Sequence, residues 1–402
     1  MNLSAKLDRL RGEDNGGHMH PPAKMPARAL ADRVKPGSSR SPRTADLARA
    51  LDAERLDEGV LVCKRQYMLP ADGVADIDLS ALPEVHELSA PDWLYIDTET
   101  TGLSGGTGNL AFMIGVARLL DCERVEVCQY VLGGFSAEPA MLRALLEWVG
   151  PRSVPVSYNG KCFDLPILAT RLALNRIDAD LESMHQLDLM YGVRRAFRRY
   201  WPDCRLQTVE RRLLGQHRID DLPGAQAPAA WQDWLRSGAT AAMRRVLAHN
   251  FQDLVSLVLL HRRLLGLYAV GGDSAGDRTA IGRAWLKAGR PELARRVWEK
   301  AGEKLDADGV LQLAALYRRQ GEWARAEALW LRLHAAGNTS AALALSKYHE
   351  HRRRDYRRAL EYAESCEAIE RAPRSVRLHG KIDAAAQLSL WQPPTLLSWQ
   401  KG

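Results

Sequence analysis

YIDTETTGLSGGTGNLAFMIG, residues 95–115, begins as an apolar run and continues into a loop rich in glycine. Two carboxylates, Asp97 and Glu99, stand one residue apart where the apolar run ends. Residues i and i+2 of a strand face the same side, so both side chains point into one pocket. Two unpaired carboxylates there raise each other's pKa and cost stability unless a cation binds them. The stretch therefore predicts a buried strand that ends at a site for a divalent metal.

Two further polar clusters follow along the chain. In SYNGKCFDLPIL, residues 157–168, a strand is expected to end before the turn NGK, and Asp164 falls near the start of a helix. A helix cap or dipole partner is the commoner role for an Asp there and stays open as an alternative. In HNFQDL, His249 and Asp253 are four residues apart on a predicted helix and therefore share a face. A local hydrogen bond is the alternative for that pair.

Short β-like runs and helical runs alternate over residues 91–268. The strand patterns are WLYID, NLAFMIGVARL, RVEVCQYVL and VPVSY, and a tight polar segment joins the second to the third as in a hairpin. Helical spacing of apolar residues marks AEPAMLRALLEWV, LQTVERRLLG and TAAMRRVLAHNFQDLVSLVLLHRRLLG. We expect an α/β fold in which a mixed sheet is flanked by helices.

Both ends of the chain differ from this middle part. The first 50 residues are rich in Pro, Gly, Ser and Arg, which predicts a disordered basic arm at 1–50 and an N-terminal extension at 51–90. Beyond the sheet domain, GRPELARRVWEKA, GEWARAEALWLRL and RDYRRALEYAESC begin at residues 289, 321 and 354. This period resembles tetratricopeptide (TPR) repeats and predicts an all-α repeat domain at 277–370, with a C-terminal tail at 371–402. A generic helical bundle is the alternative.

Composition restricts the function classes. The 402 residues carry 56 basic and 49 acidic side chains, a net charge of +7 that mildly favours a polyanionic partner such as nucleic acid. The six cysteines show no C-x-x-C spacing, so neither a zinc site nor a disulfide framework is indicated. No apolar run is long enough to span a membrane, and the N-terminus lacks a signal core, so we expect a cytoplasmic protein without a membrane partner.

The three polar clusters together carry a resemblance. DTETTG, NGKCFD and HNFQD, in that order and at those distances, resemble the three exonuclease motifs of the DEDD group of the ribonuclease H-like superfamily. The loop TTGLSGGTG and the segment IDDLPGAQAPAAWQDWL are similar to the YprB-like branch, whose members often carry C-terminal TPR repeats. The resemblance covers about residues 93–265. It implies a ribonuclease H-like fold for the sheet domain.

The resemblance also implies roles for individual residues. It makes Asp97, Glu99, Asp164 and Asp253 the carboxylates that bind two divalent cations, Mg²⁺ or Mn²⁺, and it makes His249 the candidate general base. In the histidine class of these nucleases the His stands five residues before the last Asp. Here the gap is four, the spacing typical of the tyrosine class, so His249 is expected to act from a shifted position.

Substrate contacts are implied for the loops beside these acids. The residues concerned are Thr100, Thr101, Gly102 and Leu103 near a terminal nucleotide, and Asn159 and Phe163 beside Asp164. A simple flexible turn accounts equally well for the glycines of the first loop. His185 and Asp188, in HQLDLM, are expected to be structural.

Two basic runs need separate interpretations. RRAFRRYW, residues 194–201, interleaves arginines with aromatics inside the sheet domain, which favours a nucleic-acid path. HEHRRRDYRR, residues 349–358, is expected to be a solvated helix face.

These observations predict a metal-dependent nuclease, a 3′–5′ exonuclease that hydrolyses single-stranded DNA or RNA at ends or overhangs by a two-metal mechanism. The helical repeats would dock a protein partner or support the substrate. The alternative is a nucleic-acid-binding or scaffold protein that has little or no catalytic activity and acts through its TPR-like repeats.

Overall fold

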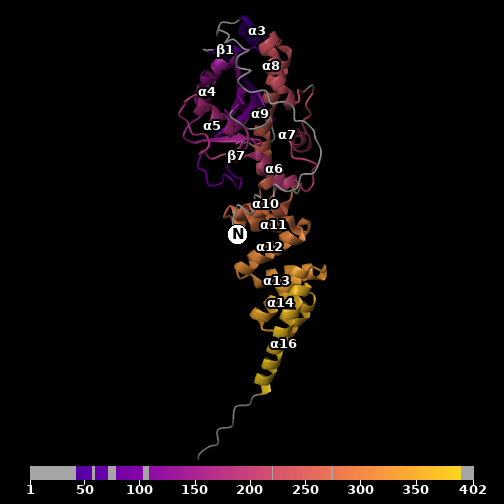
Figure 1. The fold of residues 1–402 in the computed structure, drawn as a ribbon. Coiled ribbons are helices and arrows are strands. Elements are labelled where there is room, and N and C mark those ends of the chain that lie inside the picture. The colour runs from indigo at the N-terminus through magenta and orange to yellow at the C-terminus, as the bar shows by residue number, and fades with distance from the viewer. Residues whose placement is uncertain are drawn as a thin grey trace, which may run out of the picture.

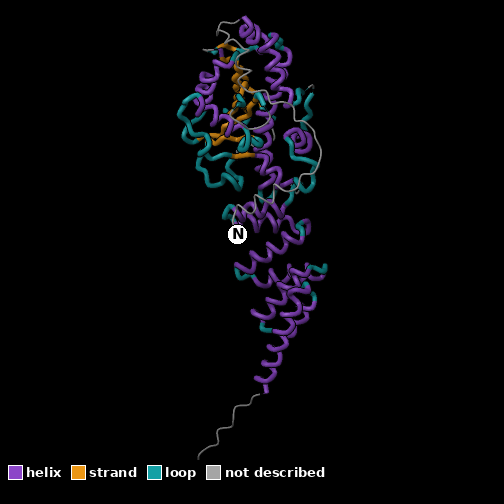
Figure 2. Tube along the Cα trace, in the orientation of Figure 1, coloured by secondary structure: helices purple, strands orange, loops and turns teal. Residues whose placement is uncertain are grey.

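The computed structural model describes residues 42–56, 59–70, 78–102, 108–219, 221–272 and 275–390. A mixed sheet with helices around it forms one end of an elongated molecule, and a series of helices extends away from it (Figures 1 and 2). The predicted α/β class, with a mixed sheet flanked by helices and followed by an all-helical region, is confirmed.

The described strands form one seven-stranded sheet in the order β1-β2-β5-β4-β3-β6-β7. Their bounds are β1 (Glu54–Arg55), β2 (Val60–Met68), β3 (Asp92–Thr100), β4 (Ala111–Leu119), β5 (Arg124–Leu132), β6 (Ser153–Ser157) and β7 (Leu187–Asp188). Strands β3, β6 and β7 are parallel, and the remaining neighbours are antiparallel. The carboxyl ends of the three parallel strands therefore meet at one edge of the sheet, where polar side chains from each can converge.

Helices cover both faces of this sheet. Their bounds are α3 (Pro42–Leu51), α4 (Glu138–Leu146), α5 (Asp164–Leu174), α6 (Leu189–Phe197), α7 (Leu206–Val209), α8 (Ala227–Ser237) and α9 (Ala241–Tyr268), with a π-helix η3 (Glu210–Leu214) after α7. Strand β3 shows why two layers form. Tyr95 packs with Leu257 and Val258 of α9, whereas Ile96 packs in a second core with residues of α4, α5 and α8. The alternation of side chains along β3 thus places Asp97 and Glu99 on the face that carries Tyr95.

A polar relay ties α9 to the sheet. Asp97, Gly115 and Gln129 lie opposite one another on β3, β4 and β5. Gln129 Nε2 donates to Asn250 Oδ1 at 2.7 Å, and Asn250 Nδ2 donates to Asp97 Oδ2 at 2.7 Å. Gly115 leaves room for this contact, because a Cβ atom there would lie 2.2 Å from Asn250 Oδ1 and 2.7 Å from Leu254 Cδ1. Helix α9 can therefore pack this closely against the sheet only because residue 115, on β4, has no side chain.

Gly115→Ala is expected to push α9 away from the sheet and to lower the free energy of unfolding by about 1–3 kcal/mol, the usual cost of overpacking. Chemical denaturation measures the change. Gly150→Ala is the matched control, because its Cβ would meet only Ser153 Oγ at 3.8 Å. Equal stability of the two variants would contradict the close approach described above.

The structure corrects the predicted N-terminal boundaries. Residues 42–51, assigned almost entirely to a disordered arm, form helix α3, since Leu47 and Leu51 lie one turn apart and both are buried. Strand β2, predicted to lie in an extension outside the sheet domain, pairs with β5 along its whole length. The rest of the predicted arm, residues 1–41, lies outside the described residues.

After α9, the described chain contains helices and their connections as far as residue 390, and no strand. The helices are α10 (Arg278–Lys287), α11 (Pro291–Ala301), α12 (Ala307–Arg319), α13 (Trp323–Ala335), α14 (Thr339–Tyr348), α15 (Tyr356–Glu364) and α16 (Ala368–Leu390). Small residues lie where helices meet: a Cβ on Gly282 would lie 2.1 Å from Trp298 Nε1, and Ala294, Ala326 and Ala359 are fully buried. The all-α prediction is confirmed, and the TPR assignment stays a prediction. The predicted tail is wrong for residues 371–390, which continue α16.

The second basic run is not simply a solvated face. Its first two residues, His349 and Glu350, are buried in a π-helix, η6 (His349–Arg353). Glu350 accepts hydrogen bonds from Arg374, Arg377 and Lys381 of α16, at 2.8, 3.0 and 2.8 Å. Burial alone would raise the pKa of Glu350, but its hydrogen bonds with Arg377 and Lys381 outweigh burial and lower the pKa to about 2. This ion cluster fastens α16 to the preceding helices.

Because the pKa of Glu350 is lower in the folded chain than in the unfolded chain, its stabilising contribution is present above pH ~4.5 and is lost as the pH falls toward 2. Glu350→Gln is expected to lower the free energy of unfolding by about 3–5 kcal/mol at pH 7, since it leaves the buried guanidinium of Arg374 without its carboxylate. The loss should shrink as the pH falls from 5 to 3. Denaturation curves of both proteins across that range measure it, and a pH-independent difference would contradict the ion cluster.

Candidate functional site

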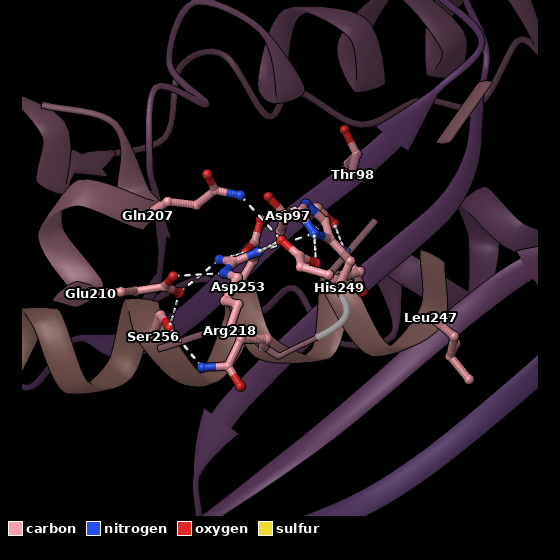
Figure 3. A network of polar contacts seen from close by, with 12 residues as sticks. Asp97, Thr98, Gln207, Glu210, Arg218, Leu247, His249, Asp253 and Ser256 are labelled. Atoms are coloured by element: carbon pink, nitrogen blue, oxygen red, sulfur yellow. Dashed lines mark hydrogen bonds and ion pairs between the residues drawn. The ribbon is translucent and has the colours of Figure 1, made fainter. Parts of the chain in front are cut away.

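The four predicted acids come together at the carboxyl edge of the parallel strands. Asp97 and Glu99 come from β3, Asp164 is the first residue of α5 directly after the loop that follows β6, and Asp253 lies on α9 (Figure 3 shows Asp97 and Asp253). The backbone N–H and hydroxyl of Thr98 donate to Asp164 Oδ1 at 3.0 and 2.5 Å. The structure thus joins three segments that are far apart in the sequence.

The electrostatics of the cluster are those of crowded, buried acids. Burial raises the pKa values of Asp97 and Glu99 well above their ordinary range, and the charges of Asp253 and Asp164 raise both further. Burial also raises the pKa of Asp164 to about 6, and it raises that of Asp253. Within the described chain Glu99 has neither a hydrogen-bond donor nor an ion-pair partner, although only 8% of it is exposed. The cluster therefore carries negative charge that the protein does not fully compensate.

Arg218 is the cation that the protein itself places at this cluster. Its guanidinium forms a two-pronged pair with Glu210, at 2.6 and 2.7 Å, and also bonds Asp253 Oδ1 (Figure 3). The side chain is 8% exposed. Neither Arg218 nor Glu210 was predicted from the sequence, because nothing local marks an arginine that becomes buried against a distant helix.

His249 lies between Asp253 and a second residue that sequence reasoning did not single out, Asp221. His249 Nδ1 lies 2.7 Å from Asp221 Oδ1, and His249 Nε2 lies 3.6 Å from Asp253 Oδ2. Although burial acts to raise it, the pKa of Asp221 is lowered by His249 and Arg218, so this carboxylate is ionised and can only accept. Arg218 Nη1 lies 3.0 Å from the same ring nitrogen, so His249 Nδ1 has both an acceptor and a donor beside it. In the neutral tautomer in which Nδ1 donates to Asp221, Nε2 is the acceptor, and it faces Asp253.

The predicted substrate residues line the same edge. The Thr100 hydroxyl donates to Gly102 O at 2.7 Å, and the Thr101 hydroxyl accepts from Leu110 N at 3.0 Å. Asn159 is half-buried beside Asp164, and Phe163 is exposed. Leu103 lies outside the described residues. These positions are close to the acids, and the substrate roles stay predictions.

The loop that delivers Asp164 is held by Asp188. The Asp188 side chain caps α6 by accepting from Met190 N at 3.1 Å, and it also accepts from Asn159 N at 2.8 Å. Gly160 permits the close turn, because a Cβ there would lie 2.5 Å from the Ser157 side chain and 2.9 Å from Asp164 Oδ2. The structural role predicted for Asp188 agrees with these contacts.

Within the described residues, no group of three or more His, Cys, Asp or Glu side chains stands in a ready-made metal-binding arrangement. Arg218 pairs with one oxygen of the fourth acid, Asp253. No described helix is long and apolar enough to cross a membrane.

Comparison with known proteins defines the class of the sheet domain. The family model of the RNase_H superfamily matches residues 94–265, so this part of the chain is a ribonuclease H superfamily domain with a nuclease-like fold. The protein YprB of Bacillus subtilis (strain 168), described as uncharacterized, is 32% identical over 295 residues, which cover 69% of this chain and 71% of YprB. The chain belongs to the YprB family. The superfamily and branch predicted from the motifs are confirmed, whereas the DEDD group stays a prediction.

A solved structure also resembles the chain. It is the family B DNA polymerase from the hyperthermophilic archaeon Pyrobaculum calidifontis, with a TM-score of 0.36 and 15% sequence identity over 58% of this chain. The matched part is 29% of that polymerase, so the chain spans less than a third of its length.

Arg218→Ala is expected to lower the free energy of unfolding by about 3–5 kcal/mol, because it leaves Glu210 buried without its cation. Arg236→Ala removes an exposed ion pair with Asp233 and should change stability by less than about 1 kcal/mol. Urea denaturation of both variants gives the comparison. Equal free energies of unfolding for Arg218→Ala and Arg236→Ala would contradict a stabilising role of the buried ion network.

Proposed function

We propose that this protein is a metal-dependent nuclease, a 3′–5′ exonuclease that hydrolyses phosphodiester bonds of single-stranded DNA or RNA. The observation that carries the proposal is the convergence of four crowded acids, one buried and three half-buried, beside a histidine whose Nε2 faces one of them. The polarity of the exonuclease follows the resemblance of the motifs.

The donor set fits divalent cations. Asp97, Glu99, Asp164 and Asp253 offer carboxylate oxygens, the ligands that Mg²⁺ and Mn²⁺ prefer, and no cysteine or second histidine is among them. Glu99 has no hydrogen-bond or ion-pair partner in the described chain, and cations would offset both the burial and the like-charge repulsion that raise the pKa values of Asp97 and Glu99. When bound, two such ions supply charge stabilisation at the attacked phosphate and the leaving oxygen and lower the pKa of a bound water.

The residues around the acids have separate tasks in this proposal. In the tautomer in which Nδ1 donates to Asp221, His249 accepts the proton of the attacking water at Nε2. Arg218 binds Oδ1 of Asp253 and leaves Oδ2 on the side of His249. Asn250 fixes the Asp97 carboxylate by its 2.7 Å hydrogen bond. Asp221, Arg218 and Asn250 are positioning residues.

One observation favours a second candidate. The Arg218 pair with Asp253 already neutralises part of the cluster without a metal ion. A nucleic-acid-binding or scaffold protein without hydrolytic activity, which docks a protein partner through helices at residues 277–370, is therefore the alternative. Under either function we propose that residues 91–268, completed by β2, form the nucleic-acid-binding unit.

Hydrolysis of labelled single strands decides between the two candidates. With Mn²⁺ or Mg²⁺ the parent should shorten DNA or RNA that is blocked at the 5′ end but not strands blocked at the 3′ end, and EDTA should abolish this. Asp97→Asn should reduce the rate by at least about a hundredfold, yet it should melt no lower than the parent, because it removes like-charge repulsion. Asp233→Asn, at an exposed ion pair, is the control and should retain activity. A parent that binds strands but never cleaves them would overturn the nuclease proposal.

A further inference from the structure

The four arginines of the run at 194–199 divide into two pairs with different surroundings. Arg195 donates to Glu84 at 2.6 Å and to the Tyr268 hydroxyl at 3.0 Å. Arg199 donates to Asp277 at 3.3 Å and to Asp306 at 2.9 Å. This pair is occupied by contacts within the protein, and Arg199 joins the sheet domain to the helical region.

The second pair, Arg194 and Arg198, faces solvent. Both residues are exposed and lie one helical turn apart, so they share a face at the carboxyl-terminal half of α6. Neither forms an ion pair or a side-chain hydrogen bond with any part of the chain that the structure describes. Two unpaired guanidiniums on one face make a local site for anions such as phosphates.

Exposed aromatic rings connect this face to the four acids. Tyr191, 41% exposed, lies one turn before Arg194 on α6. Its hydroxyl lies 3.6 Å from the Cys162 sulfur, and the next residue, Phe163, is 42% exposed and directly precedes Asp164. Exposed rings next to cationic side chains are the surfaces on which the bases of single strands stack.

The direction of α6 fits a path away from the site. The helix begins at Leu189, directly after β7 at the carboxyl edge of the parallel strands, and runs for nine residues. In Figure 1, α6 extends from the sheet toward α10. The series Phe163, Tyr191, Arg194 and Arg198, here called the α6 track, therefore starts beside Asp164 and leads toward the helical region.

We propose that the α6 track binds the single-stranded segment of a nucleic acid whose terminal nucleotide lies at the four acids. Unstacked bases can stack on Phe163 and Tyr191, and Arg194 and Arg198 can contact phosphates. A duplex would not supply free base faces to those rings, which is why a single strand fits better. Hydrolysis of the nucleic acid at its terminal nucleotide rests on the proposed function, whereas binding of the single-stranded segment to the α6 track does not.

Binding in EDTA tests the α6 track without any hydrolysis. Fluorescence anisotropy with labelled dT20 should show that Arg194→Gln/Arg198→Gln binds at least about tenfold more weakly at 0.1 M salt. The slope of log K against log salt should fall by about 1.4, which is two phosphate contacts on a single strand. Phe163→Ala/Tyr191→Ala should weaken binding by about 5- to 100-fold and leave the salt slope unchanged. Arg318→Gln/Arg319→Gln, an exposed pair on α12, is the charge-matched control and should bind like the parent.

The outcomes separate the α6 track from the nuclease proposal. Equal affinity of the Arg194→Gln/Arg198→Gln variant and its control would overturn the track, as would an equal loss of affinity for a blunt duplex. If the track variants lose binding while the parent never hydrolyses a strand, the track stands and the nuclease proposal fails. In an active enzyme, the track variants should cleave long strands more slowly than the parent does.

Discussion

The amide of Asn250 is the contact on which the arrangement of the site depends. It accepts from Gln129 and donates to Asp97, and so it fixes helix α9 against three neighbouring strands. Asp253 lies three residues further along the same helix, on the turn that reaches the acids. The position of Asp253 relative to Asp97 is therefore set by a polar relay that exists only because Gly115 leaves space beneath it. Apolar packing alone would hold α9 against the sheet but would not fix the position of Asp253 relative to Asp97.

Around that relay the protein places charges in two layers. The inner layer is the four acids, whose burial and mutual repulsion favour a bound cation. The outer layer contains Arg218, which pairs with the carboxylates of Glu210, Asp221 and Asp253, and Asp221, which also contacts His249. Any cation that binds Asp253 shares this carboxylate with Arg218. The strength of metal binding would then depend on how firmly Glu210 retains the guanidinium, so the ion network couples local stability to function.

The sequence patterns placed each member of the inner layer on its strand or helix, and the resemblance of the motifs predicted their joint role, whereas nothing predicted the outer layer. Asp97 and Glu99 could be placed from strand periodicity, Asp164 from a helix start, and His249 with Asp253 from their spacing of one helical turn, because each is a local pattern. Arg218 and Asp221 come from a connection between helices, and their partners are fixed only when the chain folds. The boundaries of α3 and α16 were missed for a related reason: composition predicted a tail, whereas tertiary packing of Leu47 and Leu378 orders the helices. Likewise, the four arginines of RRAFRRYW are visible in the sequence, but it does not show that two of them, Arg195 and Arg199, form ion pairs within the chain.

Crystals of the full chain soaked with Mn²⁺ test the central claim most directly. The account predicts anomalous diffraction peaks among the carboxylates of Asp97, Glu99, Asp164 and Asp253, and their loss in crystals of Asp164→Asn. Clear density for these side chains with no anomalous peak among them, at Mn²⁺ concentrations that saturate any effect on melting temperature, would contradict it.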